Sequence, residues 1–205
     1  MDTTNVPAQL DAADPGPGYT NFGGTGSSAS KLIAVWVPGQ SATFLPTGMG
    51  VRFPENANII LQIHYPAGIS SQVDSTRINF QYTSSWRRDV SIDAPLTHYN
   101  LDQGFLSIPA NTTRTFTSHY TMTANVSVLG VGPHMHLIGK SIRSWGVTPA
   151  NDTIPFINVP NWDFHWQGVY QFPRIIKVPT GTTLCSSAFY DNTTNNADNP
   201  SNPPR

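Results

Sequence analysis

The sequence predicts an all-β fold, and three observations support this prediction. Short runs rich in β-branched and aromatic residues are separated by turn signals about every 8–12 residues. Pro (18) and Gly (16) are frequent among the 205 residues, and no long amphipathic helical period is present. Apolar residues make up 38% of the chain and include ten Phe, seven Tyr and five Trp, which suffices for a hydrophobic core. This pattern is typical of a β-sandwich or jelly roll.

The first half of the chain is predicted to contain three main strands. Residues 1–30 are rich in Asp, Pro, Gly and Ser and are expected to form loops. The strands are expected at residues 31–37, 58–65 and 74–83. Alternation along the second of them places His64 and Gln62 on one face. The opposite face is wholly apolar and is predicted to be core: Ile59, Leu61, Ile63 and Tyr65.

The second half of the chain is predicted to be a succession of strands joined by short turns. An aromatic strand is expected at residues 161–172, where Trp162, Trp166 and Tyr170 are interpreted as core residues. The alternative is that these three side chains line a substrate cleft. The remaining strands are expected at residues 105–108, 114–122, 125–131, 141–147, 154–159, 175–178 and 183–190.

The two halves are predicted to be separate domains. The alternation of the first half is broken at residues 84–89, whose sequence is Ser-Ser-Trp-Arg-Arg-Asp. A chain of this length can form one large domain or two small ones. We therefore place the domains at residues 1–85 and 86–205.

The composition argues against several classes of partner. Only 11% of the residues are charged, against about 25% in an average domain, and the formal net charge is −1. Nucleic acid and anionic membrane surfaces are therefore not expected partners. No stretch approaches the ~20 apolar residues of a membrane span. Cys185 is the single cysteine, so it is expected to be a buried thiol or to pair with a cysteine outside these residues.

A His-x-His motif, His134-Met135-His136, follows a β-branched run and lies in that strand or at its end. In an extended chain, residues i and i+2 share one face about 6.5–7 Å apart, so both imidazoles can turn toward one metal ion. Met135 is expected to point into the core. Imidazole nitrogens suit copper, zinc, iron or nickel, and a third ligand would come from elsewhere in the chain. The alternative is two hydrogen-bonded histidines on a strand face.

Five short motifs follow one another along the chain. They are Leu61-Gln-Ile-His-Tyr65, Pro133-His-Met-His-Leu-Ile-Gly-Lys140, Asn161-Trp-Asp-Phe-His-Trp-Gln167, Val178-Pro-Thr-Gly-Thr182 and Ala188-Phe-Tyr-Asp-Asn192. In this order they resemble the copper type II, ascorbate-dependent monooxygenases, the family of peptidylglycine α-hydroxylating monooxygenase and dopamine β-monooxygenase. The resemblance is greatest to the bacterial branch and covers nearly all of the chain.

The resemblance implies two jelly-roll-like antiparallel β-sandwich domains, each with one copper ion. It makes His64 one of three histidines at the first copper, and His134 and His136 ligands of the second copper, together with a methionine. The implied reaction hydroxylates a C–H bond of a small-molecule or peptide substrate with dioxygen and a one-electron reductant such as ascorbate. The family also implies an extracellular or periplasmic location.

The remaining ligands that the family implies are expected outside this sequence. A His-His pair would lie before Asp14, and the ligand methionine would follow Arg205. We therefore interpret the chain as a central fragment, with the first domain incomplete at its N-terminus and the second at its C-terminus. Little or no turnover is expected from it alone. The alternative is a non-catalytic β-sandwich module that binds metal or another protein and has lost the complete copper pair.

Overall fold

The computed structural model describes residues 1–65, 73–85 and 87–205, which form two compact units. The first unit comprises Met1–Val35 and Ser41–Asp93, and the second comprises Trp36–Gln40 and Ala94–Arg205. A short segment from the first half of the sequence therefore belongs to the second unit. The predicted domain boundary falls next to Trp86, which lies outside the described residues. That these two units correspond to two copper domains stays a prediction.

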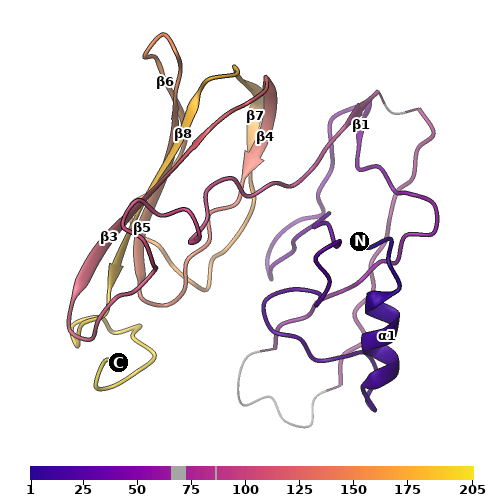
Figure 1. Ribbon diagram of the computed structural model, residues 1–205, viewed down its shortest axis with the longest axis horizontal. Helices are drawn as coiled ribbons and strands as arrows, with labels where there is room; N and C mark the ends of the chain where they lie inside the picture. Colours follow the sequence, from indigo (N-terminus) through magenta and orange to yellow (C-terminus); the bar gives the residue numbers. More distant parts are fainter. Residues whose placement is uncertain (66–72, 86) are drawn as a thin grey trace. The chain divides into compact units, whose positions relative to one another are not determined.

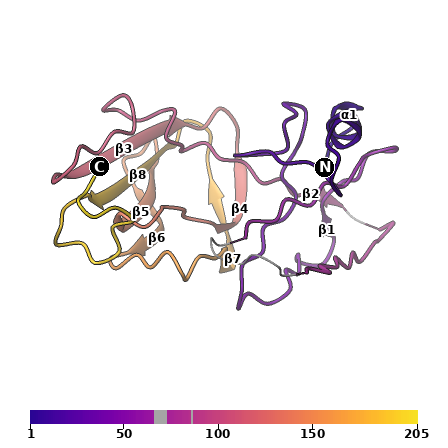
Figure 2. The same ribbon diagram turned by 90° about the horizontal axis from the view of Figure 1, so that it is seen from below.

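The second unit consists of two antiparallel sheets, which confirms the predicted all-β class. The larger sheet has the strand order β3-β8-β5-β6, which can be followed from top to bottom in Figure 2. A separate two-stranded sheet pairs β4 with β7 (Figure 1). The jelly-roll arrangement within these sheets stays a prediction. The strands are β3 Thr113–Thr121, β4 Val126–Val131, β5 Gly139–Val147, β6 Thr153–Val159, β7 Tyr170–Val178 and β8 Thr183–Asp191.

Strand β8 holds the larger sheet together because it pairs along its length with both β3 and β5. The side chain of Phe116 in β3 is buried, with 2% of its surface exposed. Its ring meets that of Tyr190 in β8 edge to face, with the centroids 5.8 Å apart. Such diagonal contacts between neighbouring strands stabilise a sheet. Cys185 in β8 is a buried free thiol, and burial raises its pKa.

The first unit contains little regular structure. Its described residues form one helix, α1 Val6–Ala13, and two very short parallel strands, β1 Met49–Gly50 and β2 Arg88–Asp89. Pro7 lies in the first turn of α1, where a missing N–H is tolerated. Residues 1–30 were expected to be loop, so this helix is a correction. Among the described residues, no helix combines the length and apolar character that crossing a membrane requires.

The strands predicted at residues 31–37, 58–65 and 74–83 are wrong, because these segments are irregular. The face of the second segment that was predicted to be core is instead partly exposed, from 39% at Ile63 to 56% at Tyr65. The alternation of side chains is a local property, whereas a strand also needs a hydrogen-bonded neighbour. Where pairing is not formed, alternation by itself does not bury a face.

The predicted aromatic strand is correct only at its end, where β7 begins at Tyr170. The preceding residues form a loop because Asp163 bonds its own backbone two and three residues onward. Its carboxylate accepts a hydrogen bond from His165 N at 2.8 Å, and its carbonyl accepts one from Trp166 N at 3.1 Å. Asp side chains commonly compete with strand pairing in this way. Trp162 is buried as predicted, but Trp166 is 67% exposed and is not a core residue.

The strand predicted at residues 105–108 is also wrong, because these residues are irregular.

Replacing Phe116 with alanine is expected to destabilise the second unit by roughly 3–5 kcal/mol, because the change leaves a cavity on the face of the sheet, beside Tyr190. Amide hydrogen exchange of β8 measures this free energy without contributions from the first unit. Phe105→Ala is the matched control, since this ring is 94% exposed and its loss is expected to change the free energy by about 0.5 kcal/mol or less. Equal effects of the two substitutions would show that Phe116 is not a core residue.

Candidate metal centre

The two histidines of the His-x-His motif lie in the connection between β4 and β5. Strand β4 ends at Val131 and β5 begins at Gly139, so the motif lies just beyond the strand end. The side chain of Met135 is 2% exposed, as predicted, whereas His134 and His136 are both exposed. The backbone therefore keeps the alternation of an extended chain through the motif, and both imidazoles lie on the solvent side.

Gly139 makes room for the buried methionine. A Cβ atom built on Gly139 would lie 2.7 Å from both Cβ and Cε of Met135, which is closer than side chains approach one another. Gly139 N also donates a hydrogen bond to His136 O at 2.8 Å, which closes the turn at the start of β5. A glycine is thus required here for close packing. This packing anchors the residue between the two histidines.

The two imidazole rings of His134 and His136 lie 5.1 Å apart between centroids, at an interplanar angle of 80°. With metal–nitrogen bonds of about 2 Å and N–metal–N angles of about 90–110°, two imidazoles on one ion have ring centres roughly 4.4–5.2 Å apart. The observed separation of the ring centres falls in this range. The spacing of the pair is therefore compatible with a shared metal ion.

The pairing of β4 with β7 determines what lies opposite the pair. The last register pair is Val131 with Tyr170. Continuing this antiparallel register three residues further places His134 opposite Gln167. Glycines allow the close approach: a Cβ atom on Gly130 would lie 2.6 Å from Tyr170 O. The polypeptide segments before β7 and after β4 therefore run side by side.

Gln167 sets the orientation of one imidazole. Its Nε2 donates a hydrogen bond to Phe164 O at 2.8 Å, which fixes which end of the amide is the carbonyl. Its Oε1 lies 2.6 Å from His134 Nδ1. Because this oxygen can only accept, Nδ1 carries the proton and the lone pair of His134 lies on Nε2. Metal-binding histidines commonly donate their other ring nitrogen to an oxygen in this manner.

The loop before β7 places the ring of Phe164 beside His136 and also contains a hydrogen-bonded pair, Asp163 and His165. The ring of Phe164 lies 5.7 Å from that of His136. Asp163 accepts hydrogen bonds from both His165 N and His165 Nδ1, which lower the pKa of this carboxyl. The carboxylate is thus engaged within its own turn. It supports the loop that carries Phe164 and Gln167.

The structure brings together two of the three predicted metal ligands. His64 is exposed and belongs to the first unit, whereas the pair belongs to the second. Within residues 1–65, 73–85 and 87–205, no group of three or more His, Cys, Asp or Glu side chains is placed to hold a metal ion. Sequence reasoning missed Gln167, although it closes the aromatic motif. Its role becomes visible only when the β4–β7 register is known.

Comparison with known proteins adds no family to these observations. No family model matches the chain, and no solved structure matches it. The assignment to the copper monooxygenases is therefore a proposal that rests on the motifs and on the geometry of the histidine pair.

Proposed function

We propose that this chain binds copper at His134 and His136 and is part of a copper-dependent monooxygenase. The observation that carries the proposal is the hydrogen bond between His134 Nδ1 and Gln167 Oε1, combined with the 5.1 Å separation of the two rings. Together these features present two neighbouring imidazoles in an arrangement that a single metal ion can use.

Copper is favoured by the donor set and by the order of the motifs. Among divalent ions of the first transition row, Cu²⁺ binds nitrogen donors most tightly, and imidazole is a ligand of copper in both oxidation states. The residues that would hold the ion are His134 and His136. Bound copper would supply the one-electron redox chemistry with dioxygen that hydroxylation of a C–H bond needs.

The protein side chains around the pair have separable tasks. The buried side chain of Met135 anchors the loop. The hydrogen bond to Gln167 keeps His134 in the tautomer whose lone pair lies on Nε2. Both rings are exposed, so dioxygen and further ligands can approach them from solvent. An accessible coordination position is what distinguishes catalytic from purely structural metal sites.

His64 is proposed as a ligand of the first copper on the motif Leu61-Gln-Ile-His-Tyr65 alone. Ascorbate or a similar one-electron reductant, a small-molecule or peptide substrate and an extracellular or periplasmic location belong to the same proposal. A non-catalytic module that only binds metal is the alternative, and the experiments below separate it from the enzyme.

The double variant His134→Ala, His136→Ala is expected to lose at least about 100-fold in Cu²⁺ affinity, because it removes both nitrogen ligands. Titration followed by electron paramagnetic resonance measures the affinity and reports nitrogen coupling to the ion. His98→Ala is the matched control, since His98 is an exposed histidine of the same unit. Equal Cu²⁺ binding by the parent and the double variant would rule out the pair as the copper site.

Replacing Gln167 with leucine is expected to lower Cu²⁺ affinity about 10–100-fold, the usual effect of losing an oxygen that orients a metal-bound histidine. Leucine is similar in size to glutamine but can neither accept the Nδ1 proton nor bind copper. Copper titration at one fixed pH gives the affinity. Gln171→Leu in β7 serves as the control, because Gln171 is an exposed glutamine of the same unit. An unchanged affinity would mean that the hydrogen bond does not orient the ligand.

Monooxygenase activity is expected from a copper-loaded protein in which this chain is combined with the ligand set that the family resemblance implies. With ascorbate, ¹⁸O₂ and a library of peptides and small molecules, the product would gain one ¹⁸O atom, detected by mass spectrometry. The His134→Ala, His136→Ala variant of that protein should give none. Tight copper binding without any ¹⁸O-labelled product would favour the metal-binding alternative.

A further inference from the structure

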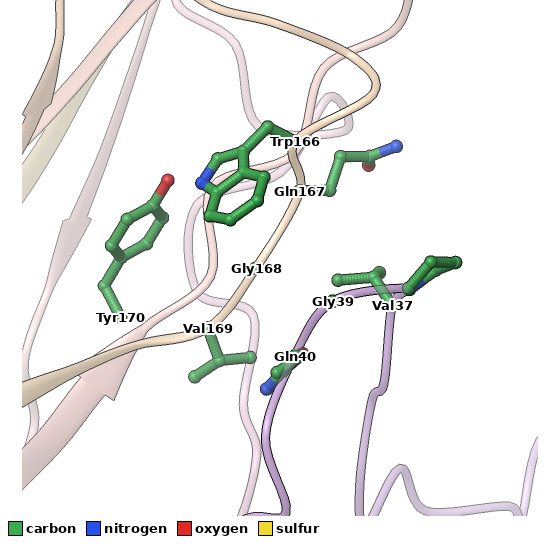
Figure 3. Close-up of a pocket in the computed structure, with 9 residues that line it drawn as sticks. Val37, Gly39, Gln40, Trp166, Gln167, Gly168, Val169 and Tyr170 are labelled. Atoms are coloured by element: carbon green, nitrogen blue, oxygen red, sulfur yellow. The ribbon is translucent and has the colours of Figure 1, made fainter.

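A small pocket lies within the second unit, between the segment Trp36–Gln40 and the start of β7 (Figure 3). Its volume is about 140 Å³, close to the roughly 150 Å³ of an engineered apolar cavity that takes up benzene. The pocket can therefore accept a molecule the size of one ring. Its lining residues are Val37, Pro38, Gly39, Gln40, Trp166, Gln167, Gly168, Val169 and Tyr170.

The lining favours a neutral, partly apolar ligand. Trp166 and Tyr170 lie on one wall, and Figure 3 shows the Tyr170 hydroxyl directed toward the indole. Val37 and Pro38 lie on the facing segment, and none of the lining residues carries a charge. A charged ligand would lose hydration here without gaining an opposite charge. An indole that is 67% exposed also offers a broad apolar face for a ring to cover.

One polar atom of the lining lacks a partner. Oε1 of Gln40 is buried, and no hydrogen-bond donor of the described residues reaches it. A buried acceptor without a donor is unfavourable, so turning this side chain toward the pocket to accept a ligand N–H or O–H would gain a bond that the protein by itself does not make. The turn that carries Gln40 is already ordered, since Trp36 Nε1 donates to Gln40 O at 2.8 Å and Gly39 has a φ of 88°.

One residue, Gln167, relates the pocket to the histidine pair. It is among the lining residues of the pocket, and its side chain bonds His134 Nδ1 at 2.6 Å. A ligand in the pocket would therefore lie against the residue that orients one imidazole. In Figure 3 the Gln167 and Trp166 side chains leave opposite sides of the segment, so the loop separates the polar from the aromatic part.

We propose that this pocket binds a neutral, ring-sized molecule that donates a hydrogen bond to Gln40, and that it holds this molecule beside His134 and His136. The apolar body of the ligand packs on Trp166 and Val37. This inference rests on the proposed function where it makes the ligand a substrate or substrate fragment. Binding itself requires no metal.

Binding is tested on the metal-free chain with benzamide, which carries a ring and an amide donor, and with toluene, which has the ring alone. Nuclear magnetic resonance follows the indole signal of Trp166. Benzamide is expected to shift this signal and to bind at least about tenfold more tightly than toluene, as one good hydrogen bond allows. Equal binding of the two probes, or binding of neither, would overturn the proposal.

Two substitutions locate the site. Gln40→Met is expected to weaken benzamide binding about tenfold and to leave toluene binding unchanged, because only the acceptor is removed. Gln9→Met, in the exposed part of α1 in the first unit, is the matched control and should change neither. Val37→Phe fills the pocket and should abolish binding of both probes. The amide spectrum of each variant verifies that it is folded, and folded variants that bind both probes as the parent does would refute the site.

Added Cu²⁺ separates failure of this inference from failure of the copper proposal. If the pocket adjoins the copper site, Cu²⁺ on the parent protein broadens the signals of bound benzamide, and the His134→Ala, His136→Ala variant binds benzamide without this broadening. Copper that binds at the pair but leaves benzamide signals sharp would disprove the placement of the ligand. A chain that binds no copper would contradict the copper proposal, while the metal-free titration would still decide the pocket.

Discussion

The packing of Met135 against Gly139 determines how the histidine pair is presented. Burying a methionine side chain contributes about 1.5–3 kcal/mol, and here the absence of a side chain on the facing glycine makes that burial possible. Because neighbouring side chains of an extended chain point to opposite sides, one buried residue directs both of its neighbours to solvent. The exposure of His134 and His136 is thus a consequence of hydrophobic burial, without any requirement for a bound ion.

The register of β4 against β7 adds the second constraint, because it decides which side chain meets His134. The strands are held close by Gly130, whose missing side chain lets the backbone approach Tyr170. A shift of this register by one residue would turn every side chain of the partner strand to the other face. Gln167 would then point away from the imidazole. The tautomer of His134 is therefore linked to backbone pairing several residues away.

The loop at residues 161–169 contacts both the histidine pair and the pocket. Its glutamine faces the polar histidine pair, and the preceding tryptophan faces the apolar pocket. A turn stabilised by Asp163 holds the loop in this conformation, with its carboxylate bonded to His165. This arrangement could place a ligand and a metal ion on adjoining surfaces of one short segment. It also explains why residues 161–169 are not a strand, despite their high content of aromatic side chains.

The sequence alone predicted the all-β class, most strands of the second unit and the burial of Met135. These predictions succeeded because they depend on periodicity and turn residues, which act over a few neighbouring positions. The strands at residues 31–37, 58–65 and 74–83 failed because pairing is a long-range property that alternation cannot supply. An apolar face such as that of Ile59 and Leu61 was therefore assigned to a core that these residues do not enter.

Local pattern determined the identity and the spacing of the histidine ligands, since residues two apart in an extended chain must share a face. Tertiary structure alone decided that Gln167 lies opposite His134, that the segment Trp36–Gln40 joins the second unit, and that Gln40 and Trp166 line one pocket. The physical reason is sequence separation. Contacts between residues far apart in the chain form only when packing and backbone pairing bring distant segments together, and no short-range pattern encodes that distance.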